Sequence, residues 1–170
     1  MKKSQRRQGF TLIEVLIVVV ILGILAATVL PQFTSANSDA KQSALGQDLQ
    51  TLRSQIQLYK FQHGGQFPGG PTATAVTFAN ALTLPTDVNG NTAAPGTAPG
   101  TAPYIYGPYF STLPSNPYNG AAGVAIVAAP ISGATVNSSS SIGWLYSPTE
   151  GLIKGNTTGN DSNGNPLINM

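Results

Sequence analysis

The chain has 170 residues, a formal net charge of +2 and no cysteine. Only 8% of its residues are charged, whereas 41% are hydrophobic. The lack of cysteine excludes a disulfide framework and a thiolate metal site. The length allows one small domain besides any leader or membrane segment.

The positive charge is concentrated at the start of the chain. Lys2, Lys3, Arg6 and Arg7 are four of the eight cations, and no acid precedes residue 10. Without residues 1–9 the side chains sum to 4 − 6 = −2. The basic character therefore belongs to the leader, and no basic surface for nucleic acid remains.

An apolar segment follows the cations. Residues 10–30 contain only three polar side chains, those of Thr11, Glu14 and Thr28. As a helix they would extend about 30 Å, the thickness of the hydrocarbon core of a bilayer. The preceding cations predict that the N-terminal end stays in the cytoplasm and that the rest crosses the membrane.

Three interpretations of this segment compete. It could be a secretory signal peptide cleaved near Ala26 and Ala27, or a plain membrane anchor. Glu14 argues against both interpretations, because inserting a charge at mid-bilayer costs about 2.5–3.5 kcal/mol of free energy. In the third interpretation, cleavage after Gly9 gives Phe10 a new amine. The amine of a neighbouring copy then pairs with Glu14 inside a bundle of these helices. We favour this third interpretation.

The same residues resemble a known family. A Lys/Arg-rich leader, the residues GFTLIE at 9–14 and an apolar helix resemble the class III signal of type IV pilins and type II secretion pseudopilins. Gly23 and Pro31 also fall where that family carries a helix-loosening glycine and proline.

The resemblance assigns roles to individual residues. It implies cleavage between Gly9 and Phe10 by a prepilin peptidase. It also implies N-methylation of Phe10 and a role for Glu14 in subunit assembly and axial registry. Residues 1–9 are then a cleaved leader, and residues 10–31 are a transmembrane or filament-core helix.

Residues 32–63 are predicted to form an amphipathic stalk helix. Their apolar side chains recur at spacings of 4, 3, 4 and 3, which is one helical stripe: Leu45, Leu49, Leu52, Ile56 and Tyr59. One helix is therefore expected from Phe10 to about His63, ending at the following glycines. His63 is expected to act as a cation at the helix C-terminus rather than as a catalytic group or metal ligand.

Pro31 lies between the two halves of this helix. Proline removes a helix hydrogen bond and clashes with the preceding turn, so it predicts a kink. The resemblance favours a functional alternative, in which residues 23–31 partly unwind when the helix packs into a filament.

Residues 64–170 are expected to form a periplasmic head. Residues 76–84 predict a short helix, and residues 83–104 predict an exposed, irregular loop because they are of low complexity. Residues 123–129, 142–147 and 151–154 predict a small antiparallel sheet on the stalk, with Trp144 or Tyr146 as a core anchor. The fold class is therefore α+β, with a pilin-like architecture.

Two further segments resemble the major, G-type pseudopilin of type II secretion systems. They are LYKFQHGGQFPG at 58–69 and GPYFSTLPSNPYNG at 107–120. In that group the C-terminal loops bind calcium, which makes Asp161 the candidate ligand here. It is the only acid after Glu150, so a paired-carboxylate site is lacking and a flexible loop is the alternative.

No set of residues suited to catalysis is evident, and an enzyme is not expected. The predicted function is a structural subunit of a type II secretion pseudopilus, a homo-oligomeric filament for protein export. The resemblance implies membrane lipid, a prepilin peptidase, an inner-membrane assembly platform and an ATPase motor as partners. One alternative is a type IV pilin for adhesion, twitching or DNA uptake. Another is a membrane-anchored binding module that does not polymerise.

Overall fold

The computed structural model describes residues 9–161 and 164–170, without the side chains of residues 30, 31, 34 and 35. Apart from Gly9, the expected leader therefore lies outside the described residues. The chain divides into an N-terminal unit, Met1–Ala40, and a head unit, Lys41–Met170.

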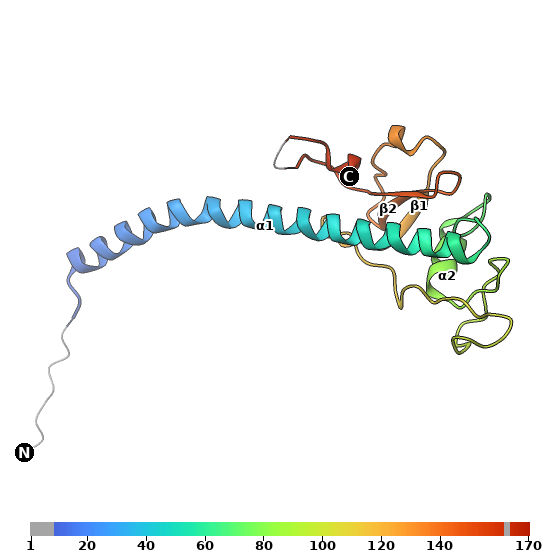
Figure 1. Cartoon of the computed structure of the whole chain (residues 1–170). Helices are drawn as coiled ribbons and strands as arrows, with labels where there is room; N and C mark the ends of the chain where they lie inside the picture. The colour runs from blue at the N-terminus through green and yellow to red at the C-terminus, as the bar shows by residue number, and fades with distance from the viewer. Residues whose placement is uncertain (1–8, 162–163) are drawn as a thin grey trace, which may run out of the picture. The chain divides into compact units, whose positions relative to one another are not determined.

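The expected long helix is present as α1 (Leu12–Gln62), of 51 residues (Figure 1). It begins two residues later than expected, because Thr11 caps its first turn. At the other end, the Gly65 N–H donates to the Lys60 carbonyl at 2.9 Å. Gly64 and Gly65 have φ values of +60° and +92°, a left-handed conformation that glycine adopts without strain.

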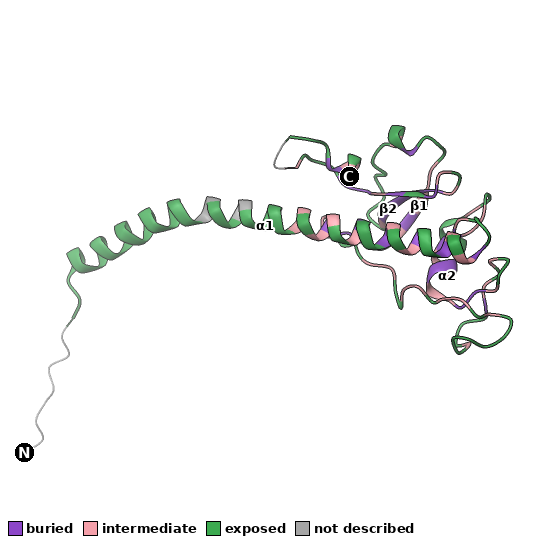
Figure 2. Cartoon of the chain, viewed as in Figure 1, coloured by how far each residue is buried: buried purple, intermediate pink, exposed green. Residues whose placement is uncertain are grey.

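The predicted apolar stripe is confirmed as the core of the head unit. Its five side chains are at most 2% exposed, and they alternate with exposed positions on α1 (Figure 2): Leu45, Leu49, Leu52, Ile56 and Tyr59. Full burial of each aliphatic side chain contributes roughly 1.5–3 kcal/mol. Trp144 and Tyr146 pack in the same core, so both anchor it.

The expected short helix is α2 (Ala75–Thr83). Thr74 and Thr77 form reciprocal hydrogen bonds that cap its N-terminus. Its buried residues are Phe78, Ala81 and Leu82, and the Phe78 ring centroid lies 4.1 Å from that of Tyr146. The helix thus covers a second side of the same core.

The sheet is mixed, not wholly antiparallel. Its strands are β1 (Gly123–Ile126), β2 (Ile142–Ser147) and β3 (Leu152–Gly155), in that spatial order. The β2–β3 hairpin is antiparallel as expected, but β1 runs parallel to β2. Parallel strands need a crossover of a dozen or more residues. Residues 127–141, which include the 3₁₀ helix η1 (Ile131–Gly133), supply it. A second 3₁₀ helix, η2 (Leu167–Asn169), ends the chain.

His63 follows the last residue of α1 and is buried, with 1% of its surface exposed. Its Nδ1 donates to the Tyr59 carbonyl at 2.8 Å, and its Nε2 hydrogen-bonds the Thr86 hydroxyl at 2.9 Å. Its ring also stacks on Tyr59, with the centroids 3.8 Å apart. His63 therefore joins the end of α1 to the segment around Thr86.

The segment 83–104 is less irregular than expected. Both copies of its Ala-Pro-Gly-Thr repeat form the same turn, in which the threonine N–H and hydroxyl donate to the alanine carbonyl. The glycines, Gly96 and Gly100, have positive φ as this turn requires. Thr86 and Ala93 are buried, so this segment also anchors to the core.

Candidate functional site

The N-terminal unit presents an apolar surface without any cover from the described chain. Residues 12–29 have a mean hydropathy of 3.0, and they qualify by length and composition as a membrane span. Residues 9–29 are all exposed (Figure 2). So large an apolar surface requires lipid or other protein around it.

Glu14 lies in the first turn of α1 and is held there by Thr11. The Thr11 N–H and hydroxyl donate to Glu14 Oε2 at 2.8 and 2.7 Å. In return, the Glu14 N–H donates to the Thr11 hydroxyl at 3.3 Å. This is a capping box, in which an N-cap threonine and a glutamate three residues later satisfy each other's backbone donors. The Thr-x-x-Glu spacing in the sequence is the signal from which this cap could have been predicted.

The capping box fixes the position of the Glu14 carboxylate without using all of its hydrogen-bond acceptors. Both donors from Thr11 reach one oxygen, Oε2, and the side chain remains exposed. A carboxylate oxygen can accept more than one hydrogen bond. The group is therefore fixed in position at the positive end of the helix and can still accept a cationic donor from outside the chain.

Gly9 and Phe10 precede the helix. Neither is helical, and Phe10 is 87% exposed. A peptide bond outside regular structure can adopt the extended conformation that peptidases bind. The geometry of this segment is thus compatible with cleavage between Gly9 and Phe10, which stays a prediction.

The proposed helix-loosening residues lie within α1. The helix continues past Gly23 and Pro31, and the Pro31 side chain lies outside the described residues. A Cβ added to Gly23 would meet nothing within 4 Å, so no contact inside the chain requires glycine there. Loosening of residues 23–31 in a filament stays a prediction.

Asp161, the candidate calcium ligand, closes a turn. Its Oδ1 accepts the Asn165 N–H at 2.7 Å, and its Oδ2 accepts the Asn165 side-chain amide at 3.1 Å. The Asp161 N–H donates to the Asn165 carbonyl at 2.8 Å. Both carboxylate oxygens therefore already have donors from the protein.

The same turn occurs at Asp87. Its Oδ1 and Oδ2 accept the backbone and side-chain N–H groups of Asn91 at 2.9 and 2.8 Å. The side-chain amide of Asn91 holds the pKa of the Asp87 carboxyl below its ordinary value. The two segments read DVNGN and DSNGN in the sequence, a repeat from which the shared turn could have been predicted. Its recurrence indicates that Asp161 and Asn165, like Asp87 and Asn91, pair to close a turn.

Calcium binding at Asp161 stays a prediction, and the hydrogen bonds of the turn favour the alternative of a loop without metal. The described part of the chain holds no group of three or more His, Cys, Asp or Glu side chains that could bind a metal. We therefore expect chelation of calcium to leave the urea midpoint of the purified chain unchanged. Asp161→Ala should lower the free energy of unfolding by about 1 kcal/mol with or without calcium, since it removes the turn's hydrogen bonds. Asp87→Ala is the matched control. A midpoint that falls on chelation in the unmodified chain, but not in Asp161→Ala, would instead show a calcium site.

Comparison with known proteins locates the chain in a family. Residues 4–30 match the prokaryotic N-terminal methylation motif. The chain is 34% identical over 116 residues to the type II secretion system core protein G of Aeromonas hydrophila. It is 31% identical over 114 residues to the protein of that name from Klebsiella pneumoniae. These alignments cover 68% and 67% of this chain and 71% of each relative. The chain belongs to the type II secretion system core protein G family.

Other members of the core protein G family align over less of their length. The Pseudomonas aeruginosa protein is 48% identical over 61 residues, which are 35% of this chain and 43% of that relative. The chain thus spans less than half of that relative. No solved structure matches the chain significantly. The methylation motif includes Gly9, Phe10 and Glu14, the residues on which the sequence-based prediction of the site depends.

Proposed function

We propose that this member of the core protein G family is the structural subunit of a type II secretion pseudopilus. The observation that carries the proposal is the apolar, exposed half of α1 with one carboxylate fixed in its first turn. The role is structural, and its chemistry is assembly rather than catalysis.

Processing is the first step of the proposal. The leader cations keep the N-terminus in the cytoplasm, the apolar half of α1 crosses the inner membrane, and the head lies in the periplasm. A prepilin peptidase hydrolyses the peptide bond between Gly9 and Phe10 and methylates the new amine of Phe10. The exposed, non-helical backbone at Gly9 and Phe10 supports this step.

Pairing follows processing. The new amine is positive and lies at the end of a helix whose dipole is also positive there. Glu14 of a neighbouring copy offers the compensating charge, and the capping box holds it in a defined position. Because an unpaired charge in lipid is costly, the pair favours one axial register between adjacent helices.

Growth of the filament needs components outside the chain. An inner-membrane assembly platform collects subunits from the lipid, and an ATPase motor supplies the energy. The apolar surface of residues 12–29 then exchanges lipid for other copies of the same helix. The filament moves cargo proteins toward the outer membrane.

The decisive measurement is the mass and N-terminal residue of the protein purified from membranes of its own cell. We expect a chain that begins at Phe10 and carries one methyl group. The matched control is the same cell without its prepilin peptidase, where the chain should begin at Met1. A start at Met1 in both cells, or a start beyond Val29, would contradict the proposal.

A further inference from the structure

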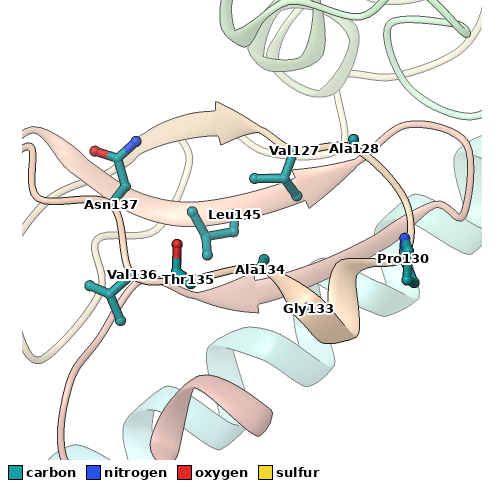
Figure 3. Close-up of a pocket in the computed structure, with 9 residues that line it drawn as sticks. All are labelled: Val127, Ala128, Pro130, Gly133, Ala134, Thr135, Val136, Asn137 and Leu145. Atoms are coloured by element: carbon teal, nitrogen blue, oxygen red, sulfur yellow. The ribbon is translucent and has the colours of Figure 1, made fainter.

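The head unit has an apolar pocket on one face of its sheet. It has a volume of about 490 Å³ and lies between β2 and the crossover that joins β1 to β2. Figure 3 shows crossover residues from Val127 to Asn137 curving around Leu145 of β2. None of the residues lining the pocket is charged.

The pocket faces away from the α1 side of the sheet. Trp144 and Tyr146 belong to the core that contains the α1 stripe, whereas Leu145 does not. Successive side chains of a strand point to opposite faces. Leu145 and the pocket around it therefore lie on the outer face of β2.

Hydrogen bonds fix the wall of the pocket at three points. The Val127 N–H donates to the Tyr146 carbonyl at 2.9 Å. In the middle, the Ile131 N–H donates to Glu150 Oε2 at 2.8 Å. At the far end, the Asn137 N–H donates to Asn156 Oδ1 at 2.7 Å. The pocket is thus preformed and does not depend on a ligand to shape it.

The same unit also exposes an aromatic side chain that its own core does not use. Phe61 is 86% exposed near the C-terminal end of α1. It follows Tyr59 of the buried stripe by two residues, which is about 200° around a helix. Phe61 therefore projects from the face of α1 opposite the core.

The helix face that carries Phe61 is neutral. A solvent-exposed helix face carries charged or polar residues. Here every exposed residue of α1 within the head unit is uncharged: Ser43, Gln47, Gln50, Thr51, Ser54, Gln57, Leu58 and Phe61. The charged residues of this stretch, Lys41, Asp48, Arg53 and Lys60, are only partly exposed. A neutral face with an aromatic projection matches a neutral apolar pocket and would not suit a charged surface.

We propose that Phe61 of one copy inserts into the pocket beside Leu145 of the next copy. Within one head the two features point in opposite directions, so the contact must join two copies. A contact between different patches is heterologous, and repetition of it produces an open helical array rather than a closed dimer. The inference rests on the proposed function, because it assigns the head-to-head contact of that filament.

The contact is small. A buried phenylalanine covers roughly 150–250 Å², whereas a stable interface buries about 1,200–2,000 Å². It therefore cannot hold two heads together alone. It acts together with packing of the N-terminal helices and sets the rotation of each head against the next.

Paired cysteines test the contact, since the native chain has none. Phe61→Cys and Val136→Cys are combined in the full-length chain, because Val136 lines the pocket and is 37% exposed. Filaments assembled in the cell are treated with a short bifunctional maleimide. We expect a ladder of covalent dimers, trimers and longer products from the double variant and no cross-linked product from either single variant.

A matched pair gives the control. Val76→Cys replaces Phe61→Cys beside Val136→Cys, since Val76 is 66% exposed but lies on α2, and it should give no ladder. Filaments without a ladder in the test pair would overturn the inference and leave the proposed function standing. Dimers from Phe61→Cys alone would overturn it as well, because they indicate a symmetric contact. Failure of the unmodified chain to form filaments would overturn both proposals.

A second variant decides the case in which the double cysteine chain does not assemble. Phe61→Ala removes the aromatic ring from an exposed position, so folding should be unaffected. Because the contact is small, we expect a several-fold loss that still leaves filaments to cross-link; such a loss, with an unchanged urea midpoint, supports the contact. Filaments equal to those of the unmodified chain overturn it.

Discussion

Replacing Glu14 by glutamine is expected to reduce filament assembly at least about tenfold while membrane insertion continues. Glutamine keeps the capping box, because either glutamate or glutamine can fill its third position. The substitution therefore leaves the start of α1 intact and removes only the charge. The amine of the neighbouring Phe10 then lacks its partner, and stranding one partner of a buried pair costs about 3–5 kcal/mol. A tenfold loss of assembly corresponds to about 1.4 kcal/mol, which is less than the cost of leaving the amine unpaired.

Thr11→Ala is the matched control for this prediction. It removes the donors that hold Glu14 Oε2 and keeps the carboxylate. Losing such a cap costs about 1 kcal/mol of helix stability. We expect Thr11→Ala to assemble nearly as well as the unmodified chain. Sheared filaments are compared by electron microscopy and by the ratio of pelleted to membrane-bound protein. Normal assembly of Glu14→Gln, or equal loss in both variants, would show that the charge does not set the register.

Gly143→Ala is expected to destabilise the head unit by about 3 kcal/mol, at the upper end for added volume in a packed site. A Cβ on Gly143 would lie 1.9 Å from the Ala121 carbonyl oxygen, far inside van der Waals contact. That carbonyl cannot move freely, because it accepts the Asn116 N–H at 2.8 Å. Asn116 is itself buried and donates to the Gly143 carbonyl at 2.8 Å. The substitution therefore disturbs both hydrogen bonds that Asn116 donates, one to the Ala121 carbonyl and one to the Gly143 carbonyl.

Gly133→Ala provides the comparison for the Gly143 variant. A Cβ at Gly133 would meet nothing within 4 Å, so its free energy of unfolding should change by no more than about 0.5 kcal/mol. Urea unfolding of the full chain in detergent can be followed by fluorescence. Trp144 is the only tryptophan and is fully buried, so its emission reports directly on the core. Equal urea midpoints for the two variants would show that the backbone at Ala121 moves enough to accommodate the added methyl group.

Much of the site could be predicted from the sequence because it is local. The leader cations, the residues GFTLIE and the apolar segment are adjacent in the chain, so composition and spacing are sufficient to recognise them. The capping box between Thr11 and Glu14 is equally local, and its Thr-x-x-Glu spacing is sufficient to predict it. The repeated DxNGN segments are local as well, and comparison of the two copies predicts the shared turn.

Features that depend on distant segments could not be predicted in the same way. His63 is buried because Thr86 lies against the end of α1, and nothing near His63 in the sequence indicates that partner. The strands were recognised from their β-branched and aromatic residues. Their pairing was partly wrong, because strand direction depends on where the crossover passes rather than on the strand residues. The apolar pocket beside Leu145 is likewise formed by the crossover.

Local sequence patterns specify the N-terminal signal, the length of α1, the apolar stripe on its second half and the β2–β3 hairpin. Each of these follows from periodicity or turn chemistry within a few neighbouring residues. Four features depend on the packing of the folded chain: the parallel pairing of β1, the burial of His63, the need for glycine at Gly143 and the opposed positions of Phe61 and the pocket. Those features arise where segments far apart in the chain pack together, and close packing admits one arrangement that no local pattern contains.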